Sequence, residues 1–207
     1  FNPQLMLRTN KPMKVTLASS NKGKLAEFQQ LLSGLNFDVV PQSEFQVPDA
    51  IENGLSFVEN AIIKARHASK LTGLPAIADD SGLEVDFLNG APGIYSSRFS
   101  GENATDEKNN QRLLSLLQEA EENERTARFQ CLLVYMRHPE DPTPIICQGT
   151  WEGLITLSPE GENGFGYDPL FYIPEFGCTS AQLEKTQKNK VSHRGKAMAQ
   201  LLEKLSR

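Results

Sequence analysis

The alternation of apolar and polar positions predicts a chain in which strands and helices follow one another. Residues 14–18 form an apolar run typical of a buried strand, and residues 22–32 place apolar side chains on one helical face. Residues 37–40 form a second short apolar run. Because a strand, a helix and a strand come in this order, the pattern favours an α/β fold.

Two capping residues mark the start of the next helix. Ser56 and Glu59 have the spacing of a Ser-x-x-Glu capping box, and Gly73 supplies the end of the helix. The apolar run at 76–78 then leads directly into Asp-Asp-Ser-Gly at 79–82, after which a second strand begins. We therefore expect two adjacent carboxylates at the end of a buried strand.

The second half of the chain is predicted to hold a long hairpin and three helices. Residues 128–136 and 145–156 are the expected hairpin strands. The first helix follows Thr105 and runs to about residue 121, the second spans residues 179–188, and Ser192 caps the third. The predicted core side of the first helix carries Leu113, Leu114, Leu116 and Leu117.

Composition and charge exclude several classes of protein. The chain has 207 residues, of which 39% are hydrophobic, and these values suit one globular domain. No run of ~18 apolar residues is present, which excludes a membrane-spanning helix of the usual kind. The 21 basic and 26 acidic residues give a net charge of -5, which disfavours broad affinity for nucleic acid or anionic lipid.

Cysteine usage and the first residues bear on location and on domain bounds. The cysteines form no Cys-x-x-Cys pair, which disfavours a zinc knuckle and a disulfide framework; they are Cys131, Cys147 and Cys178. With no secretory signal at the start, this usage predicts a cytoplasmic location. We interpret residues 1–12, which show no pattern, as a leader such as an expression remnant, because Met-Lys at 13–14 fits a natural start. Residues 13–207 then form a single domain.

The turn between the first strand and the first helix is a candidate anion site. Backbone N–H groups and the dipole at a helix N-terminus attract phosphate, and small polar side chains let it approach. The turn is not a P-loop, since its first glycine is missing and Leu25 follows the lysine. A capped helix start with solvated lysines is the alternative interpretation. The candidate phosphate-binding residues are Ser19, Ser20, Asn21, Lys22, Gly23 and Lys24.

The pair Asp79-Asp80 is the strongest candidate for chemistry. Two neighbouring carboxylates after an apolar strand repel each other and lose hydration unless a positive charge pairs with them. Magnesium is a natural partner, because it prefers hard oxygen ligands. A turn closed by an Asx bond is the alternative. We favour a functional role, since the strand before the pair is strongly apolar.

A glycine-rich loop offers a contact surface for a flat ligand. Residues 164–169 read Gly-Phe-Gly-Tyr-Asp-Pro, in which Phe165 or Tyr167 supplies a stacking face. Asp168 supplies an acceptor for a ring N–H group. The alternative for this segment is a tight turn with core aromatic residues.

Positive charge gathers before the last helix. Lys188, Lys190 and the Ser-His-Arg-Gly sequence at 192–195 surround the expected helix start. Basic residues there oppose the helix dipole, so they indicate an anionic or carbonyl-rich ligand. A solvated helix face is the alternative.

In their order and spacing these motifs resemble the inosine triphosphatase family of nucleoside triphosphate pyrophosphatases. The similarity runs from about residue 14 to the C-terminus and is closest to the bacterial branch, which hydrolyses ITP, dITP and XTP. It implies an elongated mixed β-sheet flanked by helices, two lobes with an active-site cleft between them, a Mg²⁺ cofactor and a homodimer. The motifs are SNKGK at 20–24, FVENA at 57–61, IADDSGL at 77–83, GAPGIYS at 90–96, FGYDP at 165–169 and SHRG at 192–195.

The resemblance also implies roles for individual residues. Asp80 takes the catalytic position and, together with Glu52, the metal position. Relatives often have two adjacent acids where this chain has Ile51-Glu52. Arg194 and His193 are expected to donate to the 6-carbonyl of the base, which adenine lacks. Besides the turn at 19–24, the implied substrate-binding residues are Lys64, Ser81, Phe165, Gly166, Tyr167, Asp168, Lys188, His193 and Arg194.

Two other functions fit parts of the pattern. A septum-formation-type nucleotide pyrophosphatase, which acts on modified pyrimidine nucleotides, typically has Ser-Pro-Arg-Arg in its first loop, whereas this chain has SNKGK at 20–24. A nucleotide-binding module without turnover is disfavoured by the intact acidic pair at 79–80 and by Lys24. The net charge of -5 disfavours a nucleic-acid-binding protein.

Overall fold

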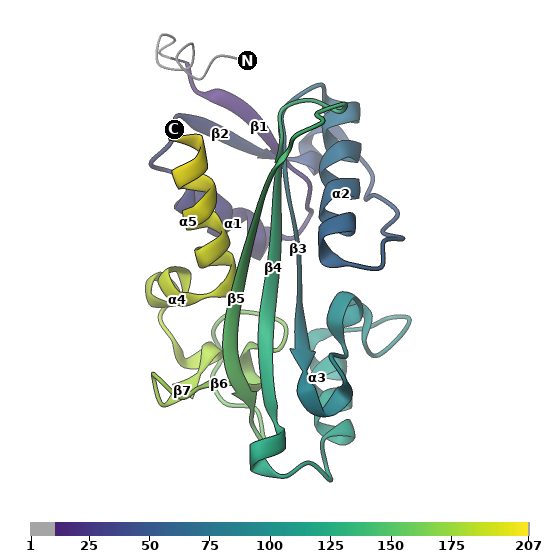
Figure 1. Cartoon of the computed structure of the whole chain (residues 1–207), viewed down its shortest axis with the longest axis vertical. Helices are drawn as coiled ribbons and strands as arrows, with labels where there is room; N and C mark the ends of the chain where they lie inside the picture. The colour runs from purple at the N-terminus through teal and green to yellow at the C-terminus, as the bar shows by residue number, and fades with distance from the viewer. Residues whose placement is uncertain (1–10, 207) are drawn as a thin grey trace. The chain divides into compact units, whose positions relative to one another are not determined.

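The computed structural model describes residues 11–206 (Figure 1). The leader expected at residues 1–12 therefore lies outside the described residues, except for its last two positions. Strands and helices alternate along the first part of the chain, as the apolar pattern predicts.

Within residues 11–206, seven strands form one mixed sheet in the order β2-β1-β3-β4-β5-β6-β7. β1 pairs in parallel with β2 and β3, whereas β6 pairs antiparallel with both β5 and β7. The predicted α/β fold class is confirmed. The strands are β1 Met13–Leu17, β2 Phe37–Pro41, β3 Ala76–Val85, β4 Thr126–Met136, β5 Ile145–Ile155, β6 Phe171–Ile173 and β7 Cys178–Thr179.

Local capping accounts for the bounds of the helices. Ser56 Oγ accepts a hydrogen bond from Glu59 N at 3.3 Å, and Gly73 ends α2 with a φ of 69°, so both predicted ends are confirmed. No helix among residues 11–206 is long and apolar enough to cross a membrane. The α-helices in this part of the chain are α1 Lys22–Leu31, α2 Phe57–Thr72, α3 Asp106–Leu116, α4 Lys185–Val191 and α5 His193–Leu205.

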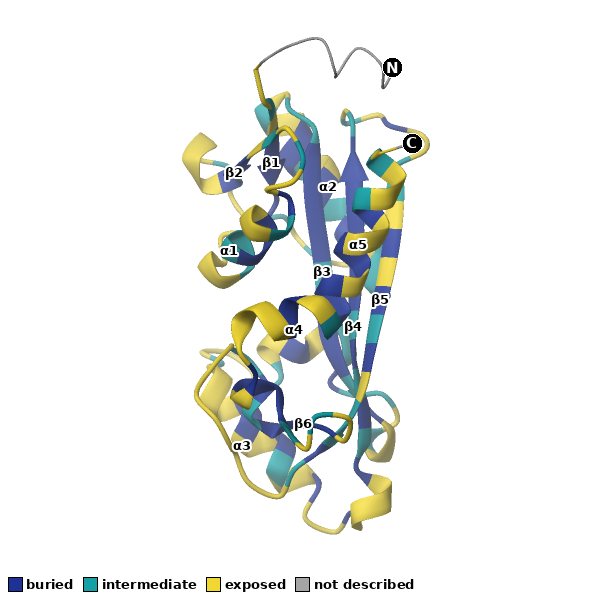
Figure 2. Ribbon diagram, turned by 90° about the vertical axis from the view of Figure 1, so that its left-hand side faces the viewer, coloured by how far each residue is buried: buried dark blue, intermediate teal, exposed yellow. Residues whose placement is uncertain are grey.

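The chain folds into two compact units, which share the long strands. Unit 1 comprises the described residues up to Asp80, Leu132–Gln148 and the residues from Ala197 on. Unit 2 comprises Ser81–Cys131 and Gly149–Lys196. Each of β3, β4 and β5 therefore contributes residues to both units, and Figure 2 shows that β3 is largely buried along its length.

Each unit has its own apolar core. In unit 1 the alanines of α2 and β3 pack with Leu132, Val134 and Met136 of β4. In unit 2 the rings of Phe129, Trp151 and Phe171 pack on one another, with ring centroids 4.5 to 6.5 Å apart. Leu113 and Leu117 of the predicted leucine face join this second core, as expected. Leu116 does not, because its side chain lies on the solvent side with 45% exposure.

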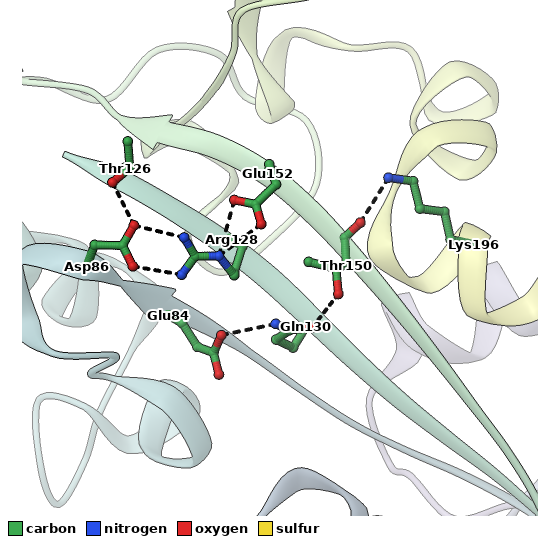
Figure 3. A network of polar contacts seen from close by, with 8 residues as sticks. All are labelled: Glu84, Asp86, Thr126, Arg128, Gln130, Thr150, Glu152 and Lys196. Carbon is green, nitrogen blue, oxygen red and sulfur yellow. Dashed lines mark hydrogen bonds and ion pairs between the residues drawn. The ribbon is translucent and has the colours of Figure 1, made fainter. Parts of the chain in front are cut away.

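A polar network covers part of the sheet in unit 2 (Figure 3). Arg128 donates to both carboxylate oxygens of Asp86 and also to Glu152, with N–O distances of 2.8 to 3.1 Å. Thr126 Oγ1 donates to Asp86 Oδ2 at 2.6 Å. The network links β4 and β5 to the residue that follows β3.

Three expected element bounds are wrong. β3 is one continuous strand, so the acidic pair lies within a strand and not at its end. β1 pairs with Ala76 and Ile77 at the start of β3, and the strand then runs on beside β4, so its place in the sheet prevails over the turn preference of Asp-Ser-Gly. α3 stops at Leu116, well before residue 121. The helix expected at 179–188 begins only at Lys185, because Thr179 and Gln182 form a capping box that closes a short 3₁₀ turn.

Candidate active site

The turn between β1 and α1 has the form of an anion site, and one of its lysines forms an ion pair within the protein. Asn21 caps α1, since its Oδ1 accepts from Lys24 N at 3.0 Å, and Ser19 Oγ accepts from Asn21 N at 3.1 Å. Ser20, Lys22 and Gly23 are exposed. Lys24 Nζ forms an ion pair with Asp79 Oδ1 at 3.1 Å, and the Asp79 side chain is 1% exposed. Asp79 therefore holds Lys24 beside the turn.

Asp80 forms a second cluster with Lys64 of α2 and Glu52. Lys64 Nζ lies 3.1 Å from Asp80 Oδ1 and 2.7 Å from Glu52 Oε1. Successive residues of a strand point to opposite faces, which explains why Asp79 and Asp80 have different lysine partners. The structure thus brings together the two residues that the resemblance implies as metal ligands.

The charges in unit 1 leave an excess of negative charge at this point. Three carboxylates, those of Glu52, Asp79 and Asp80, face the two lysines. Burial raises the pKa of Asp80, and the charge of Lys64 opposes that rise. Burial alone would lower the pKa of Lys64, but the carboxylates of Asp80, Asp79 and Glu52 raise it. The site therefore accommodates further positive charge.

A divalent cation fits the oxygen atoms of this cluster. Asp80 Oδ2 is buried and has no hydrogen-bond partner among residues 11–206. A carboxylate oxygen left in this state is a ligand for a cation that also takes water and phosphate oxygens. No group of three or more His, Cys, Asp and Glu residues in this part of the chain could hold a metal alone. Glu52 and Asp80 would share the ion with the substrate.

The start of α2 holds the segment that carries Glu52. Gly54 N donates to Asn60 Oδ1 at 2.8 Å, and Leu55 N donates to Glu59 Oε2 at 3.2 Å. A Cβ atom on Gly54 would lie 2.7 Å from both Asn60 Oδ1 and Glu59 Cβ, so only glycine fits there without a shift. The supporting roles of Gly54 and Asn60 were not expected. The Glu-Asn pair at 59–60, three and four residues after the helix cap, is the sequence signal for them.

The candidate nucleobase site in unit 2 is built around Asp168. Its Oδ2 accepts from Lys188 Nζ at 2.6 Å and from Phe165 N at 2.9 Å, and its Oδ1 accepts from Ser180 Oγ at 2.8 Å. Both oxygens are thus used within the protein, and Asp168 is 3% exposed. These three hydrogen bonds leave acceptor capacity on Oδ1, so the role of Asp168 toward a ring N–H group stays a prediction, while its carboxylate also shapes the loop. Ser180 was not expected to take part.

The two aromatic residues of the loop have different environments. Phe165 is half-buried, with Lys188 Nζ 5.1 Å and Arg194 Cζ 5.7 Å from its ring centroid. Tyr167 is buried, and its hydroxyl donates to Ser96 O at 2.6 Å. The expectation that Tyr167 offers a stacking face is therefore wrong, because its ring belongs to the core of unit 2. Phe165 is the ring that a ligand can reach.

The start of α5 brings two further basic residues to unit 2. Arg194 is 3% exposed, and its Nη2 donates to Ser81 Oγ at 3.4 Å. His193 is 5% exposed, and its ring stacks on Phe129 with the centroids 4.8 Å apart. Ser192 Oγ accepts from Gly195 N at 3.0 Å, which confirms the predicted cap. Arg194 thus joins Lys188 beside Phe165, whereas the His193 ring packs into the core.

Comparison with known proteins gives consistent matches along the chain. A family model described as the Ham1 family matches residues 15–204. The chain is 60% identical over 188 residues to a dITP/XTP pyrophosphatase of Vibrio cholerae, and this alignment covers 91% of this chain and 94% of that protein. It is 57% identical over 192 residues to a dITP/XTP pyrophosphatase of Escherichia coli O157:H7, covering 93% and 98%.

Solved structures match over almost the whole chain as well. A HAM1 protein from Coxiella burnetii aligns with a TM-score of 0.88 and 52% identity, covering 94% of this chain and 98% of that one. A dITP/XTP pyrophosphatase from Mycobacterium abscessus aligns with a TM-score of 0.73 and 41% identity, covering 92% and 99%.

Proposed function

This chain belongs to the Ham1 family, and on that premise we propose that it hydrolyses deaminated purine nucleoside triphosphates to the monophosphate and pyrophosphate. The curated relatives named above are dITP/XTP pyrophosphatases, and the chain spans more than nine-tenths of each. The observation that carries the proposal is the Glu52–Lys64–Asp80 cluster, with its buried and unpartnered Asp80 Oδ2.

The residues of unit 1 act on the triphosphate. The N-terminus of α1 and the turn at 19–24 offer N–H groups to phosphate oxygens. Lys64 and Lys24 supply positive charge beside them, each oriented by a carboxylate. Mg²⁺, held by Glu52 and Asp80, would neutralise charge on the phosphates and on the leaving pyrophosphate. Phosphoryl transfer needs chiefly this positioning and charge stabilisation.

Asp80 is the residue we assign to the attacking water. Its Oδ1 is held by Lys64, so Oδ2 would either ligate the metal ion or accept a hydrogen bond and then a proton from a water molecule, and the second role is the one assigned here. That water attacks the α-phosphorus, and pyrophosphate leaves with the electrons of the broken P–O bond. Burial of Asp80 raises its pKa, which makes the carboxylate a better base than an exposed aspartate.

The residues of unit 2 bind the base. The Phe165 ring stacks on the base, and Arg194, with donors only, faces the 6-carbonyl of hypoxanthine or xanthine. Adenine places an amino donor there, so its complex would leave buried donors unpaired. Replacement Arg194→Ala should lower the ITP/ATP ratio of kcat/KM. An unchanged ratio with both activities reduced would assign Arg194 to the phosphates or to structure.

The finer parts of the proposal rest on the family. We propose Mg²⁺ as the divalent metal. We also propose that the protein is a homodimer and that it is located in the cytoplasm. His193 and Ser81 stay predicted substrate-binding residues, and the cleft between two lobes stays a prediction. A second function is not favoured, since the matching relatives are purine nucleotide pyrophosphatases by name.

A substrate panel tests the proposed function. Purified protein with Mg²⁺ is given ITP, dITP, XTP, ATP, GTP and dTTP, and the released pyrophosphate and phosphate are measured separately. We expect pyrophosphate from ITP, dITP and XTP, with at least tenfold lower kcat/KM for the others, a ratio that about 1.4 kcal/mol of discrimination would give. Release of inorganic phosphate in place of pyrophosphate, or equal turnover of ATP, would reject the proposal.

A further inference from the structure

The first turns of α3 hold one residue of the Phe165 loop from both sides. Asp106 Oδ2 accepts from Gly166 N at 2.8 Å, and Asn110 Nδ2 donates to Gly166 O at 3.0 Å. Residues four apart lie on the same face of a helix, so α3 presents this acceptor and this donor together. The peptide groups on either side of Gly166 are therefore both fixed by α3.

Gly166 is the residue that separates the two aromatic rings of the loop. It adopts a φ of 63°, a conformation that glycine takes without strain. Tyr167 on one side is anchored by its hydroxyl to Ser96 O. Phe165 on the other side donates its backbone N–H to Asp168, and its ring contacts Lys188 and Arg194 but lies outside the core of unit 2. The direction of the Phe165 ring thus depends on the conformation of Gly166 as well as on these two cations.

Beside Phe165 and Gly166, part of the space between the loop and α3 is open. An open cavity of about 410 Å³ lies there, and its lining includes Asp106, Asn110, Phe165 and Gly166. Because empty space supplies no van der Waals contacts, the loop could move into it without a steric barrier. Two hydrogen bonds from α3 hold Gly166 beside this cavity.

We propose that Asp106 and Asn110 are positioning residues that set the Phe165 ring for stacking on the base. Neither residue touches the base; both act through the backbone of Gly166. This inference rests on the proposed function, because it takes the base to bind at Phe165. It assigns a part in substrate recognition to α3, a helix that carries no expected site residue.

The test compares substitutions that remove or retain each hydrogen bond. Asp106→Ala removes the acceptor, whereas Asp106→Asn keeps an oxygen that can accept from Gly166 N. Asn110→Ala removes the donor and is the second variant if Asp106→Ala fails to fold. Glu107→Ala is the matched control, since Glu107 is an exposed acid of the same helical turn and lines the same cavity.

The expected results separate the base from the phosphates. Loss of one hydrogen bond should raise KM for dITP roughly three- to tenfold, with kcat changed less than about twofold. Inhibition by inorganic pyrophosphate, which has no base, should stay unchanged. Asp106→Asn and Glu107→Ala should stay within about twofold of the wild type. Amide exchange at Gly166, measured by NMR without substrate, should accelerate in Asp106→Ala and not in Glu107→Ala.

Two results would overturn the inference. One is an unchanged KM for dITP in both alanine variants of an active enzyme. The other is an Asp106→Asn variant as impaired as Asp106→Ala, which would point to the charge at the helix start and not to the hydrogen bond. Failure of the proposed function is a different result, because the wild type itself would then release no pyrophosphate from dITP.

Discussion

The buried ion pair between Lys188 and Asp168 lends itself to a quantitative test of how the base site is built. The two side chains are 8% and 4% exposed, and Lys188 Nζ lies 2.6 Å from Asp168 Oδ2. Lys188→Met keeps the length of the aliphatic chain and removes the charge. Asp168 then keeps two donors, Phe165 N and Ser180 Oγ.

The expected loss of stability follows from the charge left behind. Removing one partner of a buried pair typically destabilises a protein by about 3 to 5 kcal/mol, because the other charge stays buried without compensation. We expect about 3 kcal/mol for Lys188→Met, at the lower end of that range, since two hydrogen bonds to Asp168 remain. Asp168→Asn in the same background removes the uncompensated charge and should restore part of the stability.

A double-mutant cycle in urea measures the coupling. The free energy of unfolding is determined for the wild type, both single variants and the double variant. We expect a coupling of about 2 kcal/mol between Lys188 and Asp168, as for residues in one network. If the stability losses of the two single variants sum to the loss of the double variant within about 0.5 kcal/mol, the two side chains act independently. That result would refute this view of the site.

Two further substitutions probe the metal site and the sheet network. Gly54→Ala places a Cβ 2.7 Å from Asn60 Oδ1, so the segment that carries Glu52 must shift. This shift should raise the Mg²⁺ concentration needed for half-maximal activity by roughly tenfold or more. An unchanged Mg²⁺ titration would contradict the expected role of Gly54. Hydrogen bonds from Arg128 lower the pKa of Asp86 from 3.8 to about 2. The ionised Asp86 carboxylate therefore contributes its whole stabilising free energy above pH 4, and this contribution is lost as the pH falls toward 2. Asp86→Asn should therefore lower the free energy of unfolding at pH 7 by about 0.5 to 1 kcal/mol, a small value because the side chain is half exposed, and the difference should vanish near pH 2.

Local signals in the sequence predicted the elements that depend on local interactions. The Ser56 cap and Gly73 stop of α2, the Asn21 turn and the Ser192 cap all rest on hydrogen bonds within a few residues. The continuous β3 was not predictable from the same signals. Its path through Asp-Ser-Gly depends on its place beside β4, which lies far away in the sequence.

The candidate site was predictable as a set of residues but not as a set of roles. Phe165 and Tyr167 flank the same glycine, and only the tertiary contact of Tyr167 with Ser96 shows which ring is buried. Asp168 looks like a free acceptor in the sequence, yet Ser180 and Lys188, both distant along the chain, occupy its oxygens. Roles of this kind depend on tertiary contacts, which the spacing of residues along the sequence does not show.

Turnover by an Asp80→Asn variant tests the central claim most directly. Pyrophosphate release from dITP is measured at saturating Mg²⁺ for the wild type, for Asp80→Asn and for Asp38→Asn, whose side chain is exposed on β2. We predict a loss in kcat of about 100- to 10,000-fold for Asp80→Asn, because the amide can neither accept the proton of water nor supply a charged ligand. Asp38→Asn should stay within about twofold of the wild type. An Asp80→Asn variant that folds and keeps more than about a tenth of the wild-type kcat would contradict the assignment of Asp80 as the base.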